Sequence, residues 1–245
     1  EGDTGNSYAS GDKETLQLPQ VQLDLMEAMA ESGKPVILCL MAGSDIDLSY
    51  AAEHFDAVMV LWYPGAQGAW ILFGDVSPSS KLPVTFYETL EELPEFTDYA
   101  MKGRTYRYME NKAQFPFGYG LTYSNVKVEN AEVRQCGRQI TVEAEVYNKG
   151  NADTEEVVQV YVKNLDSKNA IPNPALGGFQ RIFIKAGERR KVMVPVWEKA
   201  FTVVDENGER VEDGRKYEIF AGCSQPDEKS KELTGIMPVK IIWEK

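Results

Sequence analysis

The sequence predicts an α/β domain with a parallel sheet and helices, followed by an all-β antiparallel sandwich. Two observations carry this prediction. Up to about residue 100, short continuous apolar runs alternate with segments of helical spacing, which is the pattern of a parallel sheet with crossover helices. From about residue 124 onward, apolar and polar residues alternate in short segments separated by turn signals, which is typical of antiparallel strands. We therefore expect an α/β domain at 1–100, a connector at 101–123 and a β domain at 124–245.

The first part begins with an amphipathic helix. Residues 19–32 carry apolar side chains at helical spacing between a proline that suits a first turn and a glycine that suits a helix end. The runs PVILCLM at 35–41 and AVMVLWY at 57–63 predict strands that are covered on both faces. Further helices are expected at 45–54 and 67–73, before a third strand at 81–87. The apolar positions of the first helix are Val21, Leu25, Met26 and Met29.

The second part contains about seven short strands. Turn signals such as Asn148-Lys149-Gly150 and Glu206-Asn207-Gly208 separate the alternating segments, as in an antiparallel sandwich. A fibronectin type III-like module is the best description of this pattern. The strands that the alternation predicts are 139–146, 156–162, 178–184, 190–196, 216–222 and 239–243.

Composition excludes several classes of function. The net charge of -12 argues against nucleic acid as a partner, because a phosphate backbone is bound mainly by clustered Lys and Arg. No apolar run is long enough to predict a membrane span, and the first thirty residues lack the pattern of a secretory signal. Three widely spaced cysteines indicate neither a disulfide framework nor a zinc site. A cytoplasmic protein is therefore favoured over a secreted one, a processed secreted chain stays open, and no metal or organic cofactor is expected.

Two loops follow the carboxyl ends of the first two strands, where open α/β sheets commonly bind ligands. They are Ala42-Gly43-Ser44 and Pro64-Gly65-Ala66. We expect Gly65 and Gly68 to serve a turn and close helix packing rather than substrate contact. The aromatic connector at 88–117 has two interpretations, a sugar-binding surface or packing between domains, and packing is favoured. His54, the single histidine, is expected to be structural, and one histidine cannot supply a persuasive Ser-His-Asp triad.

Several long motifs resemble glycoside hydrolase family three. In the first part they are LWYPGAQGAWILFGDVSPSSKLPVTFY at 61–87 and FPFGYGLTYS at 115–124; in the second they are VYNKG, EVVQVYV, LGGFQRIFIKAGE and YEIFAG. The resemblance implies the rear of the family's α/β sandwich domain, hence a partial sandwich, joined to its fibronectin type III-like domain. One departure is Ala66-Gln67-Gly68-Ala69, where many members carry a Gly-Glu-Gly group.

The resemblance implies a retaining exo-acting β-glycosidase, with β-glucosidase as the first interpretation and β-xylosidase as the alternative. Such enzymes use two carboxyl groups roughly 5 to 5.5 Å apart. In this family the aspartate nucleophile lies in a preceding barrel domain, and its Ser-Asp-Trp-like motif does not occur here. The expected partners are a β-linked glucoside or oligosaccharide and the missing N-terminal barrel segment, with homo-oligomers left open. A noncatalytic carbohydrate-binding or scaffolding module is the competing hypothesis.

The resemblance also points to a general acid/base at Glu1. The family places this glutamate in a Glu-Gly pair, followed about ten residues later by Gly-Asp and a basic residue; Glu1-Gly2 and Gly11-Asp12-Lys13 match that order. A glutamate at a chain start is ordinarily a solvated surface group, and Asp3, Asp12 and Glu14 are nearby competitors. A free α-amino group on Glu1 would oppose the raised proton affinity that the role requires.

Overall fold

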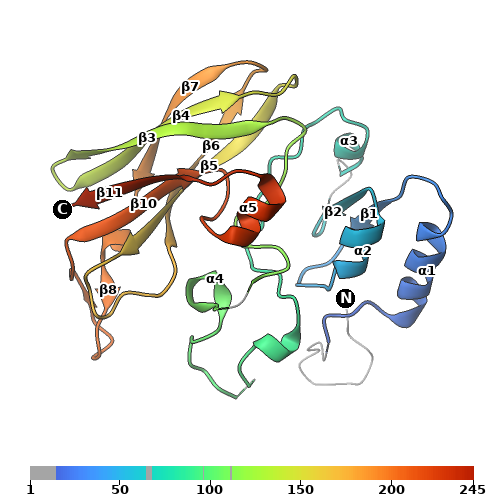
Figure 1. Cartoon of the computed structure of the whole chain (residues 1–245), viewed down its shortest axis with the longest axis horizontal. Coiled ribbons are helices and arrows are strands. Elements are labelled where there is room, and N and C mark those ends of the chain that lie inside the picture. Colours follow the sequence, from blue (N-terminus) through green and yellow to red (C-terminus); the bar gives the residue numbers. More distant parts are fainter. Residues whose placement is uncertain (1–14, 65–67, 96, 111) are drawn as a thin grey trace.

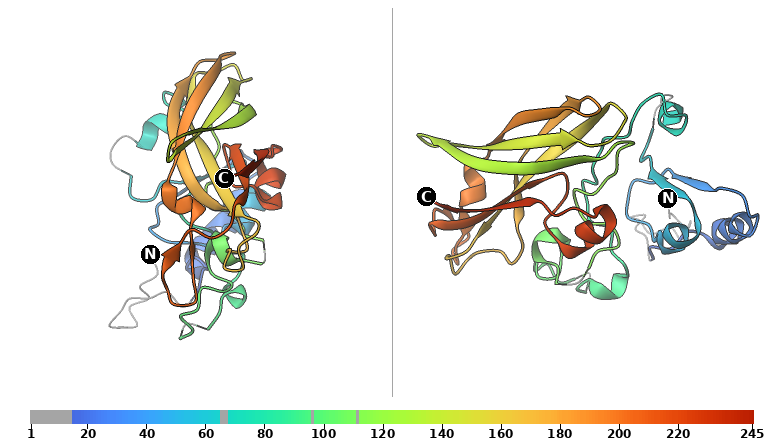
Figure 2. Two further views of the ribbon diagram at one scale, coloured as in Figure 1. Left: turned by 90° about the vertical axis from the view of Figure 1, so that its left-hand side faces the viewer. Right: turned by 45° about the horizontal axis from the view of Figure 1, so that its top comes forward.

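The structure is a computed structural model that describes residues 15–64, 68–95, 97–110 and 112–245. Two parts lie side by side, with the β-sandwich at one end and the smaller α/β part at the other (Figure 1). Helices α4 (Thr105–Tyr108) and α5 (Glu228–Thr234) lie between them in both orientations that show the junction (Figures 1 and 2). The connector packs against both parts, so the structure does not divide the chain sharply. The domain limits at 1–100, 101–123 and 124–245 therefore stay predictions.

The α/β part contains the predicted parallel pair of strands. β1 (Ile37–Leu40) and β2 (Ala57–Val60) pair in parallel, from Ile37 opposite Ala57 to Leu40 opposite Val60. A small core of Leu40, Ala42, Ile46, Leu48 and Phe86 forms beside them. The helices of this part are α1 (Gln20–Ala30), α2 (Ser49–His54) and α3 (Gly68–Leu72).

The predicted third strand at 81–87 is wrong. Its only ladder contact in the described chain is an isolated antiparallel bridge between Phe86 and Phe115. The backbone instead bonds to the FPFGYG segment: Leu82 N–H donates to Tyr119 O at 2.8 Å, and Gly118 N–H donates to Leu82 O at 2.8 Å. Those bonds pair the backbone of residues 81–87 with the FPFGYG segment. The segment therefore links the two parts of the chain and does not join the parallel sheet, which has two strands.

The first helix forms as predicted, but most of its apolar stripe is not buried. Met26 is buried, whereas Val21, Leu25 and Met29 are 73%, 60% and 45% exposed. Two strands are too narrow a surface to cover a stripe of this width. The three exposed side chains therefore form an unpacked face on α1.

The second predicted helix is shorter than expected. It begins at Ser49 rather than Asp45, because acidic side chains in this stretch accept hydrogen bonds from backbone N–H groups. Asp45 and Asp47 thus build a loop before α2 instead of its first turn. The bond between Asp47 and Ser49 is local, and bonds of this kind commonly compete with helix formation.

The second part is the predicted antiparallel sandwich. One sheet has the order β11-β10-β5-β6 and the other β3-β4-β7, and their facing side chains form one core that includes Val142, Val158, Val194 and Ile219. The bounds are β3 Val126–Cys136, β4 Gln139–Asn148, β5 Thr154–Asn164, β6 Ala175–Ile184, β7 Arg189–Val196, β10 Lys216–Gly222 and β11 Val239–Glu244, with a small hairpin of β8 Val203–Val204 and β9 Arg210–Val211.

The connector packs between the domains, as the favoured interpretation predicts. The Tyr106 ring stacks on Phe117 with centroids 4.2 Å apart and meets the buried Tyr161 edge-on at 6.3 Å. Leu176 N–H donates to Tyr106 Oη at 3.1 Å, and Asn173 Nδ2 donates to the carbonyl of Tyr106 at 2.9 Å. These contacts use the rings and the backbone of the connector to hold the sandwich.

Candidate functional site

The candidate site lies at the carboxyl ends of β1 and β2. Because the two strands are parallel, the loops that follow Leu40 and Val60 emerge at the same edge of the sheet. This is the edge where α/β sheets bind ligands. Met41 and Tyr63, one from each loop, are 65% and 73% exposed there. The edge therefore presents an apolar and an aromatic side chain to whatever lies next to it.

Trp62 turns the chain shortly after the end of β2. Its φ of 54° lies in the left-handed region, which is an outlier for a bulky residue and costs on the order of 1–3 kcal/mol. The ring packs edge-on against the buried Phe86 with centroids 6.3 Å apart. This packing anchors the turn that carries Tyr63 to the exposed edge.

Asp45 ties the first loop to the link between the domains. Its Oδ2 accepts a hydrogen bond from Tyr87 N–H at 2.8 Å. The residue thus positions the 81–87 segment beside the sheet even though that segment does not join it.

Asp47 is a second anchor in the same loop. Gln17 Nε2 donates to its Oδ2 at 2.6 Å, while the backbone and hydroxyl of Ser49 and the Nε2 of Gln114 donate to its Oδ1. Burial alone would raise the pKa of this carboxyl, but the hydrogen bonds from Ser49, Gln114 and Gln17 outweigh it and hold the pKa below its usual range. Asp47 is therefore ionised near neutral pH and cannot act as a proton donor.

The residue that the sequence analysis assigns as acid/base, Glu1, lies outside the described residues, as do its competitors and the stretch Gly65–Gln67. The structure does not test that assignment. His54 packs its ring on Tyr50 with centroids 4.4 Å apart, which agrees with a structural role. In the described ranges, no three His, Cys, Asp or Glu side chains group in a way that could hold a metal ion. The helices of those ranges also include none that is long and apolar enough to cross a membrane.

A buried ion pair that the sequence did not predict joins the two parts. Lys81 Nζ lies 2.8 Å from Glu156 Oε1, and the two side chains are 9% and 5% exposed. Lys81 also donates to the Gly120 carbonyl at 2.6 Å. Burial raises the pKa of Glu156 despite the opposing charge of Lys81. The pair fixes the link segment on strand β5.

Known proteins resemble this chain over nearly its whole length. A xylan 1,4-β-xylosidase of Xylanibacter ruminicola is 39% identical over 93% of this chain and 27% of its own length. A periplasmic β-glucosidase of Salmonella typhimurium is 30% identical over 89% of this chain and 31% of its own length. The crystal structure of a family 3 β-glucosidase of Bifidobacterium adolescentis superposes with a TM-score of 0.81 at 26% identity, covering 95% of this chain and 36% of that one.

Two domain profiles match separate parts of the sequence. The glycosyl hydrolase family 3 C-terminal domain matches residues 1–123, and the fibronectin type III-like domain matches residues 156–225. This chain spans about a third or less of the length of the two curated relatives named above. With half of the chain matched by the family's own domain, this protein belongs to glycoside hydrolase family 3.

Proposed function

We propose that this chain is the C-terminal segment of a retaining, exo-acting β-glycosidase, most simply a β-glucosidase that hydrolyses terminal non-reducing β-D-glucosyl residues. The observation that carries the proposal is the similarity to proteins named as β-glucosidases and β-xylosidases over about nine-tenths of this chain. The exposed edge with Met41 and Tyr63 supports it, since it leaves an open surface at the ligand-binding end of the sheet.

In this proposal Glu1 is the general acid/base, and the nucleophile lies on the part of the longer protein that this sequence does not cover. The acid/base must protonate the departing oxygen and later activate water. The two aspartates that flank the described site are engaged otherwise: Asp47 is held ionised by its hydrogen bonds, and Asp45 accepts from Tyr87 N–H. Both observations support a proton donor from another segment.

The remainder of the protein is the proposed partner of the α/β part. A sheet of two strands is marginal by itself, and here it lies beside the unpacked α1 face of Val21, Leu25 and Met29. Ile37, at the start of β1, is also 50% exposed. We infer that the rest of the polypeptide covers these side chains, since burying apolar surface is the main favourable term in such contacts.

β-Xylosidase is the second candidate, and a specific observation favours it. The relative named as a xylosidase is 39% identical, whereas the one named as a β-glucosidase is 30% identical. The two activities are separated by kcat/KM for matched aryl β-glucosides and aryl β-xylosides, measured on the complete protein. A higher value for the xyloside would replace the first interpretation by the second. Carbohydrate binding with no hydrolysis of either substrate would support a noncatalytic module.

The role of Glu1 is tested by Glu1→Gln in the complete protein. A missing acid slows substrates with poor leaving groups most, because activated aryl groups depart without protonation. We expect kcat/KM to fall by about 10²–10⁴ for an alkyl or sugar leaving group and far less for a dinitrophenyl glycoside. Glu14→Gln is the matched control and should leave both substrates unchanged. Equal slowing of both substrates by Glu1→Gln would contradict the assignment.

A further inference from the structure

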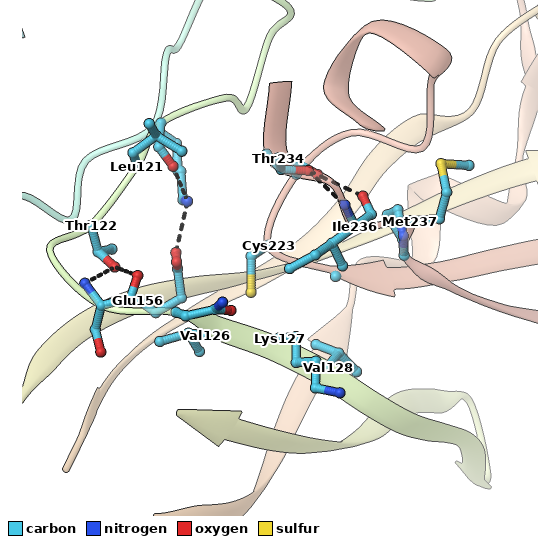
Figure 3. Close-up of a pocket in the computed structure, with 17 residues that line it drawn as sticks. Leu121, Thr122, Val126, Lys127, Val128, Glu156, Cys223, Thr234, Ile236 and Met237 are labelled. Atoms are coloured by element: carbon cyan, nitrogen blue, oxygen red, sulfur yellow. Dashed lines mark hydrogen bonds and ion pairs between the residues drawn. The ribbon is translucent and has the colours of Figure 1, made fainter. Parts of the chain in front are cut away.

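A cavity of about 200 Å³ lies where the two parts of the chain meet (Figure 3). It is lined by Lys81, the turn from Gly120 to Thr122, strands β3 and β5, the residues that follow β10 and the segment before β11. It is distinct from the edge of the parallel sheet, since neither Met41 nor Tyr63 borders it.

The wall of the cavity includes the buried ion pair of Lys81 and Glu156. Lys81 Nζ and Val157 N–H both contact Glu156 at Oε1, at 2.8 and 2.6 Å. A carboxylate has about four acceptor positions on its two oxygens. The two contacts named above leave other acceptor positions on the carboxylate, so Glu156 keeps the capacity to accept a hydrogen bond from a molecule in the cavity.

Apolar side chains form another part of the wall. Val126, Val128, Ile236 and Pro238 border the cavity together with the thiol of Cys223, as the labelled side chains in Figure 3 show for four of these five. Burial raises the pKa of the Cys223 thiol well above its usual range, and the charge of Glu156 adds to the effect. The thiol is therefore neutral and behaves as a small apolar group.

We propose that this cavity binds a small neutral alcohol, whose hydroxyl donates to Glu156 and whose hydrocarbon body lies against Val128 and Ile236. Water could satisfy the carboxylate but makes poor contacts with the apolar wall, and displacing weakly ordered water by an apolar group gains affinity. The size limit is one six-membered ring, since a cavity of about 150 Å³ holds benzene. Lys81 disfavours a cation, and Glu156 disfavours an anion.

Binding is tested by ¹⁹F NMR of 4-fluorophenol added to the protein. The comparison compounds are fluorobenzene, which lacks the hydroxyl, and 4-fluorobenzylammonium, which is charged. We expect saturable binding of the phenol, with fluorobenzene about tenfold weaker, as the loss of one hydrogen bond to a charged group predicts, and with the ammonium weaker still. Equal affinity for all three compounds, or no saturable binding of the phenol, would overturn the proposal.

A matched pair of variants locates the binding. Ile236→Trp places a large ring in the cavity and should abolish binding, whereas Ile242→Trp, at a site on β11 that is 52% exposed and does not border the cavity, should not. Circular dichroism checks that both variants fold. Phenol binding that survives Ile236→Trp in a folded protein would contradict the site.

Discussion

Among single residues, Asp47 links the strand edge to its surroundings through several hydrogen bonds. The donors are Gln17, Ser49 and Gln114. Since these bonds hold the folded-state pKa below the unfolded value near 3.8, Asp47 contributes stability that is present above the unfolded pKa. That stability is lost as the pH falls through the folded pKa.

Asp47→Asn should therefore lower the free energy of unfolding at pH 7, by about 1 kcal/mol for weakened bonds to a charged acceptor. The difference from the unaltered protein should shrink as the pH falls below about 3.8 and through the folded pKa, because Asp47 is then protonated and both proteins carry a neutral side chain. Urea unfolding at a series of pH values measures it. Asp75→Asn, at an exposed aspartate after α3, is the control and should change the free energy of unfolding at pH 7 by less than about 0.5 kcal/mol. A difference that stays constant down to pH 2 would contradict this role.

The Lys81–Glu156 pair gives a second prediction at this scale. Lys81→Met should destabilise the chain by about 3–5 kcal/mol, because it leaves a buried charge without its partner. The double change Lys81→Met with Glu156→Met should recover much of this loss, since a buried pair is often replaceable by apolar side chains. Denaturant midpoints measure both. A double variant that is no more stable than Lys81→Met would contradict this explanation, because the loss would then not come from the unpaired charge of Glu156.

Some of these residues were accessible to sequence reasoning and others were not. The glycine and proline after β2 mark the edge of the sheet, so the position of the candidate site follows from the strand pattern. The ion pair does not, because Lys81 and Glu156 lie in different domains and no local pattern couples them. The role of Asp47 depends on Gln114, which is likewise remote in sequence.

At the scale of elements, the link segment shows where local patterns mislead. Residues 81–87 alternate in the manner of a strand, but their backbone bonds go to residues 114–119. The strands of the sandwich were predicted well because alternation and turns are local. β3 and α5 were missed, although Asp227, which caps α5, and Gly235, at a φ of 71°, are recognisable end signals.

The turn at Gly118 is the most constrained point of this link. Its φ is 78°, and an added Cβ would lie 2.4 Å from both Gln159 Oε1 and Tyr161 Oη. Gly118→Ala should thus cost more than the approximately 1–2 kcal/mol expected for backbone strain alone. Gly137→Ala is the matched control, since its φ is 61° but nothing lies within 4 Å of the added Cβ. Equal losses of thermal stability in Gly118→Ala and Gly137→Ala would contradict the crowding around Gly118.

On the scale of the whole molecule, the two parts differ in completeness. The sandwich closes its core with two sheets, whereas the α/β part has two strands and leaves the α1 face of Val21, Leu25 and Met29 unpacked. The motifs predicted this asymmetry through the family resemblance, because they match the rear of a larger domain.

Leu25→Gln tests whether the remainder of the protein covers the exposed face of α1. In the 245-residue chain it should change the free energy of unfolding by less than about 0.5 kcal/mol, as expected for an exposed position. In the complete protein it should destabilise by about 1–3 kcal/mol if the remainder buries this side chain. Val204→Gln, on the exposed hairpin of the sandwich, is the control and should be neutral in both. A neutral effect of Leu25→Gln in the complete protein would remove α1 from the proposed contact.

The most direct test of the account is the activity of the purified 245-residue chain, with and without the rest of its protein. A retaining mechanism needs a nucleophile and an acid/base on opposite sides of the bond, and we assign at most one of them to this chain. We predict no turnover of an aryl β-glucoside or β-xyloside by the chain alone, and turnover once the remainder is supplied. Hydrolysis by the isolated chain, free of any companion polypeptide, would contradict the account.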